Sequence, residues 1–189
     1  RLQDLQLGGD FNQSLASVNL PAGLRSLVFG EAFKQCLQGV IWPDGLLTLT
    51  FGERFNQSMS EVTLPVGLRQ LHFGGNFNQN VAGVLPPSLV WLHFGRGFNQ
   101  SLAGVDLPAG LVVLHFGSDF NQSLAGVDLP AGLQTLTFGR RFSQSVPEVV
   151  WPTSLHTLVL GAMFGHELQA VMLPPRCEVI RNAGAAEHH

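Results

Sequence analysis

The sequence predicts an all-β solenoid of about eight coils, each about 22 residues long, with one strand per coil in a parallel sheet. Phenylalanine recurs every 22 residues from Phe11 to Phe164, with a single step of 21 residues between Phe77 and Phe98. Apolar and polar residues alternate within each unit, which is typical of a strand with one buried face. No unit contains ten residues of helical periodicity. Because one unit cannot bury its own apolar face, neighbouring units must stack into a continuous core.

The first element of each unit is a strand with the pattern Leu-x-x-Leu-x-Phe, as at Leu133–Phe138. Leu136 and Phe138 alternate with polar neighbours, so we expect them to point into the core. Gly139 follows at once, and we expect it to permit a turn that a side chain would disfavour.

The second element contains Leu124, Val127 and Leu129 and ends at Pro130, which cannot continue a central ladder. We predict that it is a second short extended segment. The chain has 14 Phe and no Tyr. This bias follows from the repeat, because every Phe occupies one of two positions, the start of the Phe-Asn-Gln-Ser phrase or the end of the strand.

The bend of each unit carries two polar columns, written Asn-Gln in most copies. A polar side chain repeated at every bend can satisfy backbone groups of its own and adjacent coils, so we predict a hydrogen-bonded ladder from at least one column. The more regular column is Gln13, Gln35, Gln57, Gln79, Gln100, Gln122 and Gln144. Four copies also read Asn-Gln-Ser, an acceptor pattern for N-glycosylation. Duplication alone explains four copies, so we expect a structural role.

The unit resembles the FNIP-type repeat of the leucine-rich repeat superfamily. The matching text is "LPAGLQTLTFG" followed by "RFSQSV", or "DFNQSL" one unit earlier. Ser replaces the Pro that follows Gln in the family pattern. The resemblance covers nearly the whole chain and implies a leucine-rich-repeat-like, right-handed solenoid. It also implies a function in protein–protein recognition.

Variation between copies concentrates at the strand positions that should point outward. The predicted partner-binding residues are Trp91, His72, His93, His115, Gln70 and Val113. The three histidines occupy one column on successive coils, and Trp91 lies beside them as a candidate anchor. Two other interpretations stay open, an ordinary exposed sheet surface and a metal site. No carboxylate shares these columns, which disfavours the metal.

Several function classes lack support in the sequence. The net charge is -3 and only 12% of residues are charged, so we expect neither nucleic acid nor membrane as a partner. No nucleophile elbow, phosphate loop, dinucleotide fingerprint or zinc-finger spacing occurs, so we predict no enzyme activity and no cofactor. The alternative to a protein-recognition scaffold is a ligand-, glycan- or ice-binding solenoid, since Thr48/Thr50 and Thr135/Thr137 form outward Thr-x-Thr pairs.

The predicted boundaries are a single solenoid domain over residues 1–182 and a tail over 183–189 that ends in a tag-like His pair. The chain opens inside a strand unit, so we expect possible edge-to-edge self-association at the N-terminal coil. The segment from Pro174 onward is a decayed final unit that we expect to act as a cap. Cys36 and Cys177 lie in distant units, which predicts free thiols and favours an intracellular location, with an extracellular one left open.

Overall fold

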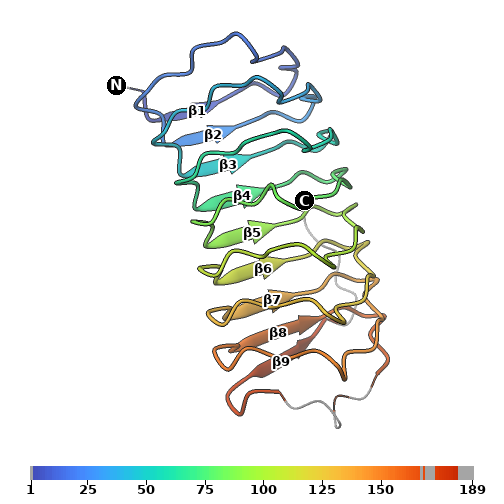
Figure 1. Cartoon of the computed structure of the whole chain (residues 1–189). Coiled ribbons are helices and arrows are strands. Elements are labelled where there is room, and N and C mark those ends of the chain that lie inside the picture. Colours follow the sequence, from blue (N-terminus) through green and yellow to red (C-terminus); the bar gives the residue numbers. More distant parts are fainter. Residues whose placement is uncertain (1, 167, 169–172, 183–189) are drawn as a thin grey trace.

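The computed structural model describes residues 2–166, 168 and 173–182, and these residues form a solenoid with one strand per coil (Figure 1). The strands are β1 Asp4–Gln6, β2 Ser26–Val28, β3 Thr48–Thr50, β4 Gln70–His72, β5 Trp91–His93, β6 Val113–His115, β7 Thr135–Thr137, β8 Thr157–Leu160 and β9 Glu178–Arg181. They make one parallel sheet in chain order. The predicted parallel solenoid is confirmed. The part of the chain that the structure describes contains no helix able to cross a membrane.

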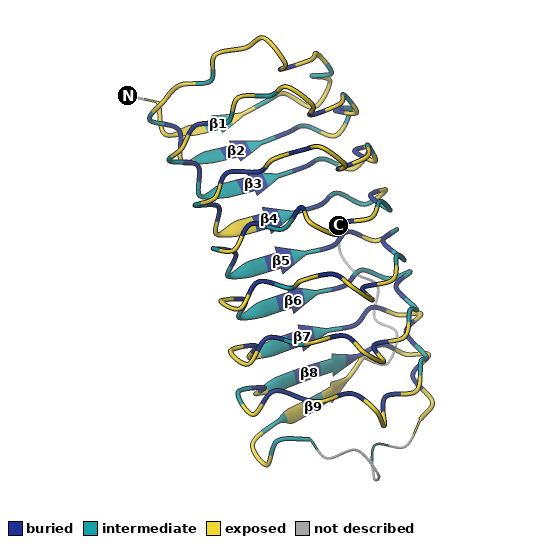
Figure 2. Cartoon of the chain, viewed as in Figure 1, coloured by how far each residue is buried: buried dark blue, intermediate teal, exposed yellow. Residues whose placement is uncertain are grey.

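The register of the sheet follows the repeat, because equivalent residues pair across every step. Leu92 of β5 faces Leu114 of β6, which faces Leu136 of β7. The 21-residue step leaves this pairing intact, since Leu71 still faces Leu92. The deleted residue therefore falls in a loop, and the strand positions remain comparable along the chain. Figure 2 shows the consequence, with the middle of most strands buried and the turns exposed.

Phenylalanine fills the core in two adjacent columns that interlock. Within one column the ring centroids lie about one coil apart, for example 6.1 Å between Phe98 and Phe120. Between columns the rings are closer, with 3.8 Å between Phe94 and Phe98 and 3.9 Å between Phe116 and Phe120. Stacking between the rings adds to the free energy gained from burial. The restriction of Phe to two repeat positions thus has a structural cause.

The glycine that follows each strand from β2 to β8 is required by close packing between coils. A Cβ on Gly139 would overlap the carbonyl group of Gly117, and the same clash recurs at Gly30, Gly52, Gly74, Gly95, Gly117 and Gly161. This differs from the predicted role of Gly139, which was backbone freedom at the turn. The φ of Gly139 is not in the left-handed region, so the glycine is needed for its absent side chain instead.

The second element of the unit is not a strand in the described residues, which corrects the prediction of two extended segments per coil. Tight turns replace it, as Val127 N–H donates to Leu124 O at 3.0 Å and Leu133 N–H donates to Pro130 O at 3.0 Å. Backbone groups used in these turns cannot also form a ladder with the next coil. Gly126 takes a φ of 72° in the first turn, and Glu61 takes 63° at the same repeat position.

The final unit continues the sheet. Residues Leu158 and Val179 pair between β8 and β9. Arg181 donates to Phe164 O at 3.2 Å and its guanidinium lies 5.7 Å from the Phe164 ring centroid. This arginine therefore lies over the last Phe of its column, which fits a cap.

Cys36 and Cys177 are both free, as predicted. Cys177 is half-buried against the core, and burial raises the pKa of its thiol. Residues 183–189 of the predicted tail lie outside the described residues.

Candidate functional site

The outward face of the sheet is the surface on which the coils differ most. Its residues from β2 to β8 are Ser26, Val28, Thr48, Thr50, Gln70, His72, Trp91, His93, Val113, His115, Thr135, Thr137, Thr157 and Val159. None of them is Asp, Glu, Lys or Arg. Most are half-buried by their neighbours in the sheet, and Gln70 is exposed. A face seven strands wide thus presents hydrogen-bonding and apolar groups with no permanent charge.

Trp91 and three histidines form an aromatic cluster at the middle of this face. The ring centroids of His72 and His93 are 5.6 Å apart, and those of His93 and His115 are 5.7 Å apart. The imidazole planes are within 19° and 10° of parallel. The Trp91 ring centroid lies 3.8 Å from that of His72 and 6.0 Å from those of His93 and His115. The sheet therefore brings together all four residues that the sequence singled out.

The cluster changes the acid–base behaviour of its members. Burial, then the neighbouring His93 and His115, lowers the pKa of His72 from 6.5 to about 4. Burial and His93 lower the pKa of His115 as well. Both effects disfavour the imidazolium form, because a charge loses hydration here and faces a second charge. At neutral pH these two rings are uncharged.

The other two predicted contact residues flank the cluster. Gln70 faces Trp91 across the β4–β5 pair, and Val113 faces Trp91 across the β5–β6 pair. Trp91 is therefore bordered by an amide on one side and a methyl-bearing side chain on the other. The Thr-x-Thr pairs of β3 and β7 lie on either side of these three strands. They do not form the continuous threonine array that an ice-binding surface would need.

The polar columns at the bend form a ladder in which asparagine is the acceptor. Asn99 Oδ1 accepts from Asn121 N at 2.8 Å and from Gln122 Nε2 at 3.0 Å in the next coil. The same rung joins Asn12 to Lys34 and Gln35, Asn56 to Asn78 and Gln79, Asn78 to Asn99 and Gln100, and Asn121 to Ser143 and Gln144. Both polar columns therefore take part in the ladder. The Gln side chains donate, chiefly to an Asn side chain and at Gln35 also to the Asn12 backbone carbonyl, and the Asn column supplies the acceptor of both contacts.

One rung is missing where Lys34 replaces asparagine. Among the described residues, no hydrogen bond joins Lys34 to the N–H of Asn56 or to the Gln57 amide. Gln13 and Gln57 are accordingly the ladder glutamines without a side-chain acceptor in the described residues. The lysine side chain has no acceptor atom at neutral pH.

We expect Lys34→Asn to restore the rung and raise the free energy of unfolding by about 1–2 kcal/mol, the worth of one or two hydrogen bonds. In a chain of this size the melting temperature would rise by about 2–8 °C. Differential scanning calorimetry measures this change. The control is Lys34→Met, which removes the charge but supplies no oxygen. Equal melting temperatures for the two variants would show that the rung contributes nothing.

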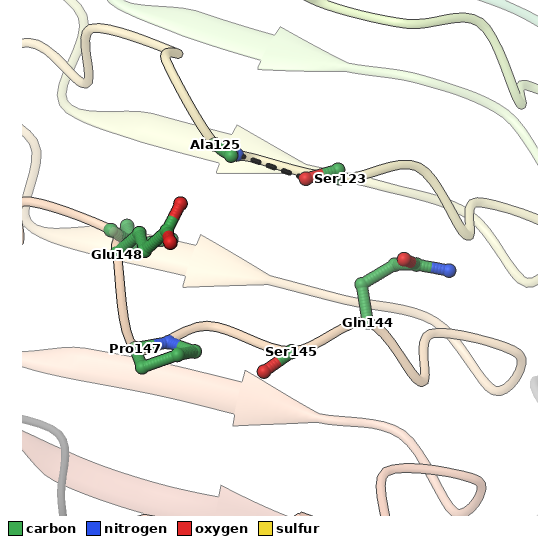
Figure 3. A pocket seen from close by; sticks show the side chains of 7 residues that line it. Ser123, Ala125, Gln144, Ser145, Pro147 and Glu148 are labelled. Carbon is green, nitrogen blue, oxygen red and sulfur yellow. Dashed lines mark hydrogen bonds between the residues drawn. The ribbon is translucent and has the colours of Figure 1, made fainter.

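A shallow hollow of about 210 Å³ lies at the turns of two adjacent coils, away from the sheet face, and is lined by Ser123, Ala125, Gln144, Ser145, Pro147, Glu148 and Val149. Figure 3 shows that the Gln144 amide points away from Glu148. Ser123 Oγ accepts from Ala125 N–H at 3.1 Å, and Gln144 donates to Asn121. Glu148 is the one ionisable group in the lining, so the hollow offers no nucleophile–base pair. The described residues also contain no group of three or more His, Cys, Asp or Glu able to hold a metal ion.

The chain is similar to a known repeat family and to a solved repeat structure. The FNIP repeat pattern matches residues 11–54, 55–97 and 98–141. No curated protein matches the chain. A solved structure described as CroV588, a novel circular LRR protein, superimposes with a TM-score of 0.88 at 43% identity. That match covers 95% of this chain and 27% of the other, so the chain spans about a quarter of the solved protein. Repeat proteins of this type are generally non-enzymatic. With the FNIP pattern matched over most of its length, the chain belongs to the FNIP repeat family.

Proposed function

We propose that this chain is a non-enzymatic scaffold that recognises a protein partner through the outward face of its sheet, with Trp91 as the central anchor. The observation that supports this most is the Trp91 cluster. A large aromatic side chain lies at the middle of the face, packed against His72 and bordered by residues of three adjacent strands. Tryptophan at the centre of a preformed surface is the residue type that contributes most to binding at protein interfaces.

The rest of the molecule supports a scaffold. The core columns repeat almost without change, while the outward strand positions differ from coil to coil. Parallel pairing along all nine strands holds these variable residues in a fixed array. A preformed array loses little conformational entropy when a partner binds. The alternative of ice binding has less support, because the threonine pairs of β3 and β7 are interrupted by the Trp91 cluster.

The test is affinity capture on the immobilised chain at neutral pH, followed by titration of the captured protein against variants. We expect Trp91→Ala to weaken binding by about 30-fold or more, the size of an interface hot spot. Val113→Glu should also weaken it, because it places a charge on an uncharged face. The matched control is Val150→Ala, since Val150 is 84% exposed but lies outside the sheet. Circular dichroism confirms that each variant is folded. An unchanged affinity for both face variants would contradict the proposal.

A further inference from the structure

The three histidines are the only titratable side chains among the outward residues of β2–β8. Every other outward residue of these strands is Ser, Thr, Gln, Val or Trp. The charge of this face is therefore decided by His72, His93 and His115 alone. Above the range in which they titrate the face is neutral, and below it the same face carries up to three positive charges in one row.

The spacing of the row is fixed by the backbone. His72, His93 and His115 pair directly with one another across β4, β5 and β6. Their ring centroids therefore stay 5.6 and 5.7 Å apart, a distance at which two imidazolium charges repel even in water. Because the strands hold the rings in register, a protonated pair has little freedom to separate. Protonation of one ring makes protonation of the next less favourable.

No carboxylate of β2–β8 offsets this repulsion, and the outward carboxylates of the sheet, Asp4 of β1 and Glu178 of β9, lie three strands from the nearest histidine of the row. The charged residues on the elements around the row are Arg69 before β4, Glu53 and Arg54 in the loop after β3, and Arg96 and Asp119 in the loops after β5 and β6. Asp119 is paired with Arg141 at 3.2 Å. The causes of the lowered pKa of His72 are burial and the other two histidines, and none of these charged residues is among them.

We propose that the histidine row makes the docking face acid-sensitive. The neutral rings stack beside Trp91 and complete an uncharged contact surface, whereas protonated rings turn its centre cationic and release a partner that had bound the neutral form. This inference rests on the proposed function for the identity of the surface. It adds that the surface binds its partner when the three histidine rings are neutral.

The stability of the free chain follows the same titration. The pKa of His72 in the folded chain is about 4, below its ordinary value of 6.5, so the unfolded chain binds more protons between these values. Stability from this residue is fully present above pH 6.5 and is lost as the pH falls towards 4. Acid therefore weakens both the docking face and the fold beneath it.

The deciding experiment is an NMR titration of the histidine ring protons, which needs no partner. In the wild type we expect His72 and His115 to titrate below the ordinary range. In His93→Thr both should titrate at least about half a pH unit higher, the coulombic effect of a charge at this spacing in water. Threonine is the residue at the same place in β3 and β7, so the variant should fold. His115→Thr provides the same test for His72, whose pKa His115 also lowers. Midpoints that do not move in either variant would overturn the inference.

A second measurement uses the protein retained by the immobilised chain at pH 7.5. As a fraction of the protein that each chain retains at pH 7.5, the wild type should release most of it at pH 4, near the pKa of His72. A variant with threonine at all three row positions should release little of what it retains, whatever its affinity at pH 7.5. Equal release from the two chains would overturn the acid-sensitive row but leave the proposed function standing. If no protein is retained at either pH, the proposed function fails, and the NMR titration still decides whether the row titrates as a coupled unit.

Discussion

Gly74→Ala is expected to lower the free energy of unfolding by more than about 4 kcal/mol and to leave much of the chain unfolded. The added Cβ would overlap the carbonyl group of Gly52 in the preceding coil. That carbonyl belongs to backbone held by its own turn, where Phe55 N–H donates to Gly52 O at 3.2 Å. The coils must therefore move apart at this position, which also loosens the Phe columns beside it.

The matched control for this change is Gly8→Ala. Gly8 occupies the same repeat position, but no atom lies within 4 Å of a Cβ built on it. Urea denaturation monitored by circular dichroism measures both variants. We expect Gly8→Ala to change stability by less than about 1 kcal/mol, because only backbone entropy changes. If the two variants lose the same stability, close approach between coils is not the reason for the glycine column.

Phe98→Ala is expected to destabilise the fold by about 3–5 kcal/mol, the usual cost of truncating a buried phenylalanine. Phe98 is fully buried and its ring contacts both Phe columns, with centroids 3.8 Å from Phe94, 6.2 Å from Phe77 and 6.1 Å from Phe120. The neighbouring coils are fixed by the sheet, so the cavity cannot collapse. The lost stacking adds to the lost burial.

The comparison for Phe98 is Phe11→Ala. Phe11 starts the same column, but it is only partly buried, and its one ring neighbour among the described residues is Phe33 at 6.2 Å. We expect a clearly smaller loss of stability in the same urea titration. Equal losses would mean that the stacked column contributes no more in the middle of the solenoid than at its end.

The sequence predicted the fold well because the repeat makes each position visible eight times. A single Leu-x-x-Leu-x-Phe strand is a weak signal, but its recurrence fixes the direction, register and buried face of the sheet. The prediction of a second extended segment was wrong, because the spacing of Leu and Val on which it rested is also compatible with successive turns. The positive φ of Gly126 and of Glu61 at the same position was the feature that decided it.

The sequence predicts which residues form the candidate site, but not how their side chains contact one another. Placing Trp91 and the three histidines on one face needed only the strand period. The contact between Trp91 and His72 depends on how the two rings tilt towards each other. The lowered pKa of His72 depends on how deeply the fold buries its ring and on the two neighbouring histidines. In the ladder at the bends, the Gln column is the more regular in sequence, so the predicted ladder residues were the glutamines. The chemistry favours Asn, whose short side chain holds Oδ1 between a backbone N–H and a Gln amide.

The most direct test of the central claim is chemical labelling of histidine with diethylpyrocarbonate at neutral pH, with and without the bound protein partner. His72, His93 and His115 lie on the outward face, while His166 is exposed outside the sheet and serves as the internal reference. If the partner docks on the outward face around Trp91, it will slow labelling of the three sheet histidines and leave His166 unchanged. Slower labelling of His166 with no change at the sheet histidines would contradict the proposed docking face.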